Sequence, residues 1–203
     1  MTGRRIPRAF FRRRTLEVAR DLLGQRLVRL ERGRRLSGWI IETEAYVGQA
    51  DLGCHARVGR TDRNRSMWGP PGHAYVYFTY GMHWCLNVVT EPEGEPAAVL
   101  IRGLIPSEGM SQMRRRRPAG RALADGPAKL CQALGLDRAW DGHDLCRKDS
   151  RLFIERAPDL PAHRIRRSPR VGLDRVPEPW KSKPWRFRIA GDLQTLLPQE
   201  ELA

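Results

Sequence analysis

Residues 74–82, with the sequence AYVYFTYGM, hold the clearest strand pattern in the chain. β-Branched and aromatic residues fill Ala74–Thr79, and a glycine breaks the pattern before a second such run at Trp84–Thr90. Strands joined by so short a link predict an antiparallel pair. Side chains alternate between the faces of a strand, so Tyr75 and Tyr77 share one face. That face is either one wall of an aromatic pocket or part of an ordinary aromatic core.

Further strand and helix patterns flank this pair. Strands are predicted at Arg26–Glu31, Leu36–Ala45, Ala97–Ile105, Arg151–Arg156 and Arg186–Ala190, with a glycine-containing turn at 32–35. One helix is predicted through Leu16–Leu23 up to Gly24, and another from Asp125-Gly126-Pro127, with Asp125 as its capping acid, to Gly135. This order predicts an α+β fold: a single domain over residues 1–203, with a mostly antiparallel curved sheet flanked by helices.

Two segments lack such periodicity. Residues 47–73 are long, irregular and rich in Gly, Arg, Asp and Pro, which predicts a pocket-forming loop. Residues 1–9 are expected to be flexible. The arginine-rich stretch 1–14 is compatible with an organelle transit peptide, but its apolar positions continue into the first helix and favour an ordinary amphipathic helix. No stretch has the apolar length of a membrane span, so we expect no membrane association.

The composition is strongly basic. The 203 residues carry 37 Lys+Arg against 23 Asp+Glu, a net charge of +14. Such an excess favours a polyanionic partner such as nucleic acid; a merely solvated cationic surface is the alternative. The same two interpretations apply to the run Arg114–Arg117. Lys129, Lys148, Lys181 and Lys183 are the only lysines, so an enzyme that needs an amine nucleophile has few candidates for it here.

The cysteines favour neither a disulfide framework nor a zinc ribbon. Cys54, Cys85, Cys131 and Cys146 form no C-x-x-C pair, and nothing before them resembles a secretory signal. A zinc site from Cys54, His55, His83 and Cys85 is the alternative, but its spacing lacks ligand pairs. Cys85 is better explained as a core residue. We therefore expect no metal and no organic cofactor.

Acidic and aromatic side chains gather in one region. All four tyrosines, Tyr46, Tyr75, Tyr77 and Tyr80, lie between the end of the strand that carries Glu44 and the turn at Gly81. Nucleobases stack on such rings, as they do in enzymes that act on a base rotated out of the duplex. Glu42 and Glu44 share one strand face, so the pattern alone does not decide which is buried. An isolated strand glutamate is usually a surface residue.

Several ordered motifs resemble the alkyladenine (3-methyladenine) DNA glycosylase family. The resemblance extends from Leu16 to Gly191. It is carried by residues 41–46, Cys54-His55, 61–64, 69–72 and 74–82, and continues through 86–88, 99–102, 126–134, 170–172 and 183–187. It implies a monofunctional DNA glycosylase of base excision repair that flips alkylated or deaminated purines and hydrolyses the N-glycosidic bond with water.

The resemblance also assigns expected roles to individual residues. Glu44 matches the general base that activates the water, and Arg102 matches the arginine that holds water and carboxylate in place. Other matches are Tyr46, His55 and Tyr77 around the flipped base, Asn87 against the guanine amine, and Tyr80 with Met82 at the DNA intercalation position. The acid that would protonate a neutral leaving base is not identified by the resemblance, and His55 is explained equally well by stacking.

The expected partner is double-stranded DNA that contains damaged purines, bound by a monomer, in the cytoplasm with the nucleoid of a bacterium or in a eukaryotic nucleus. A bifunctional glycosylase/lyase and a noncatalytic binder of damaged DNA are the alternatives. The sequence departs from the family pattern at Asp62, at His73 and in a short 55–61 segment, which bears on the range of lesions. Candidate lesions are 3-methyladenine, 7-methylguanine, hypoxanthine and ethenoadenine.

Overall fold

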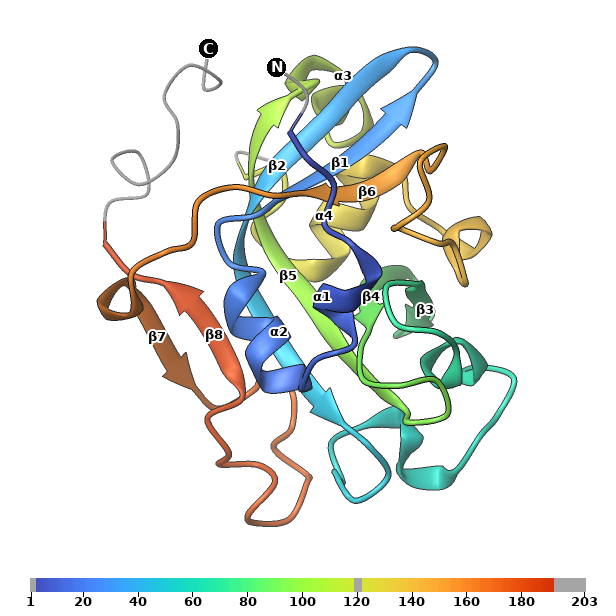
Figure 1. Cartoon of the computed structure of the whole chain (residues 1–203), viewed down its shortest axis with the longest axis vertical. Coiled ribbons are helices and arrows are strands. Elements are labelled where there is room, and N and C mark those ends of the chain that lie inside the picture. The colour runs from blue at the N-terminus through green and yellow to red at the C-terminus, as the bar shows by residue number, and fades with distance from the viewer. Residues whose placement is uncertain (1–2, 119–121, 192–203) are drawn as a thin grey trace.

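The computed structural model describes residues 3–118 and 122–191, and these form an α+β fold built on one antiparallel sheet (Figure 1). Six strands follow the spatial order β3-β4-β5-β2-β1-β6, and the hairpin β7–β8 joins the sheet through β2. The strands are β1 (Arg26–Glu31), β2 (Arg34–Val47), β3 (Ala74–Thr79), β4 (His83–Val89), β5 (Ala97–Glu108), β6 (Leu152–Glu155), β7 (Ile165–Ser168) and β8 (Arg186–Ile189). The predicted fold class is confirmed.

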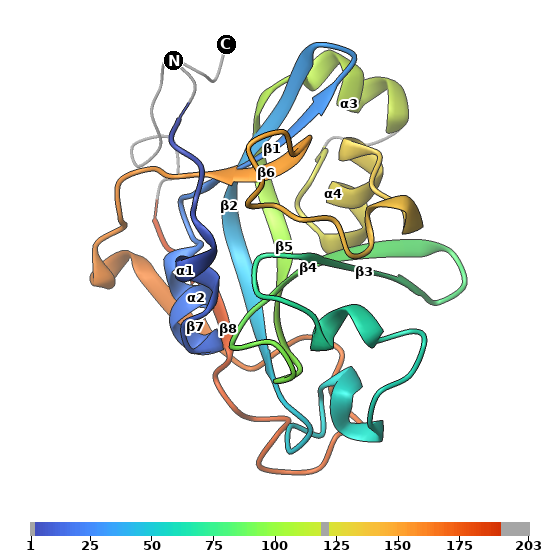
Figure 2. The same cartoon turned by 45° about the vertical axis from the view of Figure 1, so that its right-hand side comes forward.

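Helices cover the sheet at two places. The α-helices are α1 (Arg8–Phe11), α2 (Thr15–Asp21), α3 (Met110–Arg116) and α4 (Pro127–Leu134), and four 3₁₀ turns are η1 (His55–Val58), η2 (Arg65–Trp68), η3 (Arg138–Trp140) and η4 (Ala162–Arg164). α2 packs on β2, and α4 packs on β4 and β5. Figure 2 shows α4 above the β3–β4 hairpin, on the far side of the long β2–β5 pair from α1 and α2.

The long strands β2 and β5 exceed their predicted lengths, because each continues past the residues whose apolar pattern defined it. Two α-helices and one strand were not predicted: α1, α3 and β7. The helix before Gly135 is confirmed, and Gly135 ends it in the left-handed conformation with φ of 64°. Its predicted cap was wrong. Gly126 is the N-cap residue. The Asp125 carboxylate instead forms an ion pair with Lys129, with Nζ 2.8 Å from Oδ1.

Two hydrophobic clusters stabilise the fold. The larger one joins α2 and α4 to the central strands and includes Val76 and Leu86. The smaller one consists of residues from the 47–73 loop and from β3, β4 and β5: Cys54, Ala56, Met67, Tyr75, Val89 and Ala98. Partly buried Tyr46 and Tyr77 pack against this smaller cluster, so the loop and the sheet together support an aromatic wall.

The N-terminal segment that we expected to be flexible packs against the sheet from residue 3 onward. Ile6 is buried and its amide donates to the carbonyl of Ile154. The backbone of Arg5 forms an isolated antiparallel β-bridge with that of Glu155. Residues 1–2 lie outside the described part of the chain. Within that part, no helix has both the length and the apolar character of a membrane span.

Candidate active site

Paired irregularities in β2 and β5 shape the site. The register runs Ile40↔Leu104, Glu42↔Gly103 and Thr43↔Ile101, so Ile41 on β2 and Arg102 on β5 have no directly opposed partner. Such bulges re-aim side chains. The side chain of Arg102 turns toward both carboxylates of the adjacent strand, with Nε 2.7 Å from Glu42 Oε1 and Nη1 3.3 Å from Glu44 Oε2.

Glu44 is completely buried, at 0% exposure, on the opposite face of β2 from α2. Thr43, its neighbour on the other face, donates to the carbonyl of Ala19 in α2. The carboxylate of Glu44 accepts three hydrogen bonds: Val171 N–H to Oε1 at 2.7 Å, and Tyr46 Oη–H at 2.9 Å and Arg102 to Oε2. Sequence parity could not separate Glu42 from Glu44, and the structure does so by burying Glu44.

Opposing influences act on the ionisation of Glu44. Burial raises the pKa of its carboxyl above the usual range, because the charged form loses hydration. Three neighbours lower this pKa: the Arg102 charge, the Val171 amide and the Tyr46 hydroxyl. Glu42 acts weakly in the raising direction. The carboxyl is therefore held at an elevated pKa by burial, with a hydrogen-bond network that favours its anionic form.

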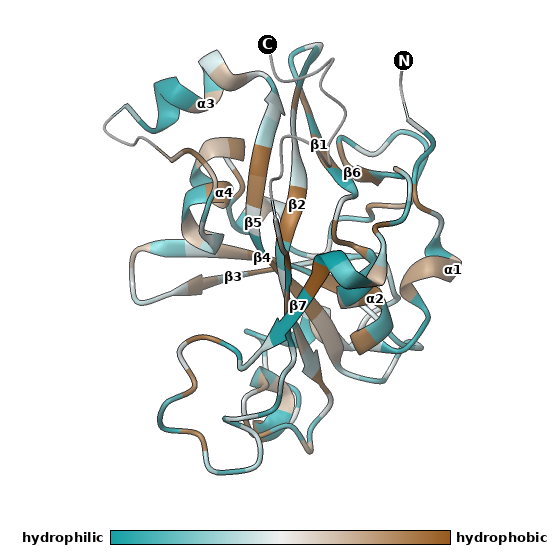
Figure 3. Cartoon of the chain, turned by 90° about the vertical axis from the view of Figure 1, so that its left-hand side faces the viewer, coloured by the Kyte–Doolittle hydropathy of each residue, from teal (hydrophilic) through white to brown (hydrophobic). Residues whose placement is uncertain are grey.

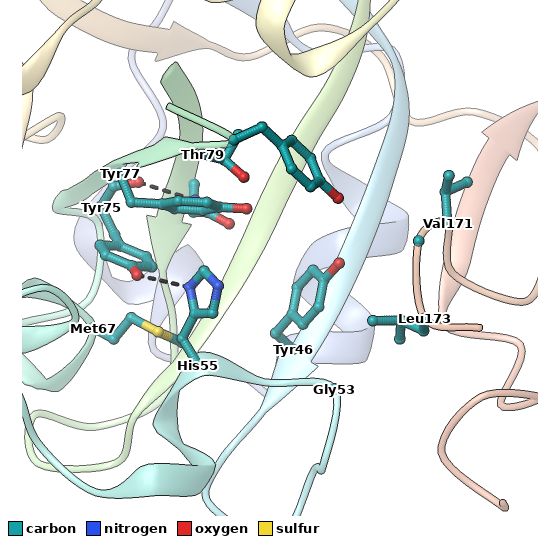
Figure 4. A pocket seen from close by; sticks show the side chains of 12 residues that line it. Tyr46, Gly53, His55, Met67, Tyr75, Tyr77, Thr79, Val171 and Leu173 are labelled. Carbon is teal, nitrogen blue, oxygen red and sulfur yellow. Dashed lines mark hydrogen bonds between the residues drawn. The ribbon is translucent and has the colours of Figure 1, made fainter. Parts of the chain in front are cut away.

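A cavity of about 160 Å³ adjoins two of the residues that bond to this carboxylate, and Figure 4 shows the side chains that line it. Glu44 does not line the cavity, but Tyr46 and Val171, which bond to its two oxygens, do. The carboxylate thus lies directly behind the wall. The complete lining is Tyr46, Gly53, His55, Met67, Tyr75, Tyr77, Thr79, Tyr80, Asn87, Val171, Gly172 and Leu173.

Of the two interpretations of the face that carries Tyr75 and Tyr77, a pocket wall or an ordinary core, both describe part of the structure: the two rings line the cavity, and Tyr75 also belongs to the smaller hydrophobic cluster. Tyr75 and Tyr77 share the cavity face of β3 with ring centroids 5.4 Å apart, and the His55 ring meets Tyr77 edge-on at 4.5 Å. His55 Nδ1 lies 2.9 Å from the Tyr75 hydroxyl (Figure 4). Burial, with Arg63 and Arg57 nearby, lowers the pKa of His55 to about 4. The imidazole is therefore neutral near pH 7.

Asn87 lines the same cavity from β4. It is buried, and its Nδ2 donates to the carbonyl of Tyr75 at 3.0 Å, which fixes the orientation of the amide. Cys85, two residues earlier, is buried beside Tyr77, so its prediction as a core residue is confirmed. Among the described residues no three His, Cys, Asp or Glu side chains are arranged to hold a metal, and the four candidate ligands form no zinc site in this structure.

The tip of the β3–β4 hairpin projects beside the cavity mouth. Tyr80 and Gly81 both have positive φ, 51° and 67°, and the Met82 amide donates back to the carbonyl of Thr79. Tyr80 is 83% exposed and Met82 is 67% exposed. The ring of Tyr80 reaches across the mouth: a methyl group on Gly172 would lie 4.0 Å from its hydroxyl.

The exposed large apolar side chains come from the segments that build the cavity. The large hydrophobic residues that are exposed among the described residues are Leu52, Val58, Phe78, Tyr80, Met82 and Val171, and each lies within three residues of one that lines the cavity. In Figure 3 the β3–β4 hairpin, the loop after β7 and α3 project to the same side. Exposed apolar side chains at a cavity mouth, such as Tyr80 and Val171, are typical of a recognition surface.

The 47–73 loop, which supplies part of the cavity lining, also carries exposed arginines. Arg57, Arg60 and Arg65 are exposed in the 47–73 loop, and no ion pair or hydrogen bond of their side chains occurs in the described part of the chain. The run Arg114–Arg117 differs. Arg116 pairs with Glu31, and Arg117 donates to Gln132. The loop arginines are therefore the more available cations.

Sequence interpretation missed one side of the cavity. Tyr75 was placed on the correct strand face, as pocket wall or core, but was not named among the site residues. Gly53, Met67, Val171 and Leu173 were not named either. The last two belong to the loop between β7 and β8, whose position depends on the pairing of β8 with Glu42–Glu44 of β2. No local pattern reports that long-range pairing. The motif at 170–172 was the one available signal.

Comparison with known proteins identifies the family. The family model for methylpurine-DNA glycosylase matches residues 9–193. A protein of Methanocella arvoryzae is 50% identical over 185 residues, covering 90% of each chain. Proteins of Chlorobaculum parvum and Myxococcus xanthus are 46% and 45% identical, covering 88% and 91% of this chain and 86% and 89% of their own. All three carry the provisional name 3-methyladenine DNA glycosylase. The chain belongs to the methylpurine-DNA glycosylase family.

Proposed function

We propose that this protein is a monofunctional DNA glycosylase that binds double-stranded DNA as a monomer, rotates an alkylated purine into the aromatic cavity and hydrolyses its N-glycosidic bond. One observation carries the proposal: a fully buried carboxylate, Glu44, lies directly behind the wall of an aromatic cavity whose mouth holds an exposed tyrosine. A buried acid at such a cavity is typical of an active site, since its burial is otherwise unfavourable.

In the proposed reaction Glu44 acts as the general base. Its carboxylate takes a proton from water as the water oxygen bonds to the anomeric carbon and the glycosidic bond breaks, and the base leaves with the bonding electrons. Arg102 and the Val171 amide hold the carboxylate ionised and oriented. Tyr46 donates to the same carboxylate, so its ring is fixed as one side of the base slot.

In this proposal the aromatic side chains of the cavity and Asn87 recognise the base. Tyr46, His55 and Tyr77 surround the extruded purine, and the amide of Asn87, fixed by the Tyr75 carbonyl, crowds the exocyclic amine of guanine. Tyr80, with Met82 beside it, fills the gap left in the duplex, which offsets part of the cost of unstacking.

The neutral state of His55 bears on the range of lesions. A purine alkylated at N3 or N7 is already cationic and leaves without protonation. A neutral base such as hypoxanthine needs a proton donor as it leaves. The imidazole of His55, with a pKa of about 4, is not protonated near pH 7 and cannot act as that acid. We therefore propose cationic alkylpurines such as 3-methyladenine as the main substrates.

A lyase activity is the weaker alternative. The residues that line the cavity include no lysine, and Lys183 instead lies 3.5 Å from the centre of the Trp180 ring. The test uses duplex DNA treated with dimethyl sulfate. The proposal expects free 3-methyladenine, intact strands and no covalent adduct on borohydride treatment. A trapped adduct would favour the lyase, and binding without base release would favour the noncatalytic alternative.

A further inference from the structure

A buried ion pair, Asp51 with Arg170, lies beside the catalytic carboxylate and plays no part in the mechanism above. Both side chains are 0% exposed, and the pair is bidentate, with Nη1–Oδ2 and Nη2–Oδ1 distances of 2.5 and 2.7 Å. Burying two charges removes their hydration, and the free energy lost in this way can equal or exceed the attraction between them. A buried ion pair is therefore poorly explained by fold stability alone. Its surroundings indicate what it does.

Arg170 connects three parts of the site. Its Nη1 donates to the carbonyl of Ala45, between Glu44 and Tyr46, at 3.0 Å. Its guanidinium lies between two rings, 4.7 Å from the centre of Tyr46 and 5.0 Å from that of Trp185. The next residue in the chain, Val171, supplies the amide that bonds to Glu44 Oε1. The position of Arg170 thus constrains both the base-stacking ring and the amide donor.

Asp51 fixes the opposite end of the pair. Its carboxylate also accepts the amides of Val47, at 3.2 Å, and Gly53, at 3.0 Å, and so closes the start of the 47–73 loop around itself. A side chain on Gly53 would come within 2.8 Å of both Arg170 Nη2 and Leu173 Cδ1. Glycine is needed there because the loop and the 170–173 segment meet directly.

We infer that Asp51 and Arg170 form a positioning clamp that holds the Tyr46 ring and the Val171 amide in register with Glu44. The inference rests on the proposed function. It adds that the base slot and the catalytic carboxylate are aligned by one buried guanidinium, outside the cavity lining. Arg170 and Asp51 touch neither substrate nor the reacting atoms.

The clamp has a measurable chemical consequence. If it loosens, the Val171 and Tyr46 hydrogen bonds to Glu44 weaken, and two of the three interactions that lower the pKa of this carboxyl diminish. Arg102 and Glu42 remain in place. The active form is the ionised carboxylate, so the rate falls as pH drops below the pKa of Glu44. A higher pKa therefore moves this fall, the acid limb of the rate profile, to higher pH. Misplacement of about 1 Å also lowers the rate at every pH by up to about 100-fold.

The test measures single-turnover release of 3-methyladenine from dimethyl sulfate-treated duplex DNA across pH, normalised to folded protein. Arg170→Lys keeps the charge but loses the planar fork, and Asp51→Asn keeps the shape but loses the charge. We expect both to slow release by about 10- to 100-fold with an acid limb at higher pH, while affinity for a duplex with an abasic-site analogue changes by less than about threefold. If neither folds, Gly53→Ala is the variant to use: its methyl group would displace the Arg170 guanidinium while both charges remain, and because Gly53 also lines the cavity, the displaced acid limb rather than the rate is the readout.

Glu155→Gln is the matched control. Glu155 is a buried carboxylate that pairs with Arg26 at 2.8 Å, far from the cavity, so its loss lowers stability but leaves the rate and pH profile of the folded enzyme unchanged. Wild-type rates and acid limbs in the folded clamp variants would overturn the clamp alone. Failure of the wild-type protein to release any methylated base would overturn the proposed function instead.

Discussion

Arg102→Met removes the one cation that touches Glu44 in the described part of the chain and leaves an uncharged, unbranched side chain. Nη1 of Arg102 lies 3.3 Å from Glu44 Oε2, with the two side chains 15% and 0% exposed, so solvent screens the pair little. An opposite charge this close lowers a carboxyl pKa by about 1–3 units, and each unit corresponds to about 1.4 kcal/mol. Without Arg102, burial and the neighbouring Glu42 raise the pKa of Glu44 further.

The assay is the single-turnover rate of base release between pH 5 and 9. Because the ionised carboxylate is active, a raised pKa means that activity is lost sooner as pH falls, and the acid limb moves up by about 1–3 pH units. The rate recovers at high pH. Arg35→Met is the control, since Arg35 pairs with Glu108 and Glu155 elsewhere on the sheet, and its acid limb stays in place. A loss of the same factor at every pH, with no displacement of the limb, would refute the electrostatic reasoning.

Three further predictions concern the rim and the cavity. Tyr80→Ala leaves thermal stability unchanged, because the ring is 83% exposed, but slows flipping as followed by 2-aminopurine fluorescence beside the lesion; equal flipping rates would exclude Tyr80 as the wedge. Replacing two loop arginines, Arg57 and Arg60, by Gln lowers the slope of log K against log salt by about 0.9 for each lost phosphate contact. Replacing Arg114 and Arg115 by Gln lowers it less; the reverse order would place the DNA face at α3. In an NMR titration the His55 ring shows no transition above pH 5, whereas a midpoint near 6.5 would contradict its neutral, buried state.

Local sequence patterns predicted the parts of the fold that depend on local physics. Alternation in β3 placed Tyr75 and Tyr77 on one face and Val76 on the other, and the structure has them so. Gly81 predicted the hairpin turn in which it takes positive φ. These features depend on side-chain periodicity and backbone sterics alone.

Elements without an apolar stripe were missed. The last turn of α3 consists of arginines and the helix buries only Met113, so it shows no amphipathic repeat. β7, with the sequence Ile-Arg-Arg-Ser, has no buried residue and pairs only with β8. Packing on α4 and β2 supports α3, and pairing with β8 forms β7, and no local pattern encodes either contact.

The candidate site was predicted in its residues more than in its geometry. Glu44, Tyr46, His55, Tyr77 and Asn87 come together around one cavity wall, as expected from the resemblance. The burial of Glu44 relative to Glu42, the bulge that turns Arg102 and the contact between Arg170 and Asp51 all depend on strand register and on segments more than a hundred residues apart. Such contacts become visible only in three dimensions.

The role of Glu44 as the base is tested most directly by Glu44→Gln, which keeps the shape of the side chain and removes its negative charge. The measurement pairs two readouts on one preparation: release of 3-methyladenine from methylated duplex DNA, and affinity for a duplex with an abasic-site analogue. We predict that release is abolished while affinity stays close to that of the wild-type protein. Release at the wild-type rate by the Gln variant would contradict the assignment of Glu44 as the group that activates water.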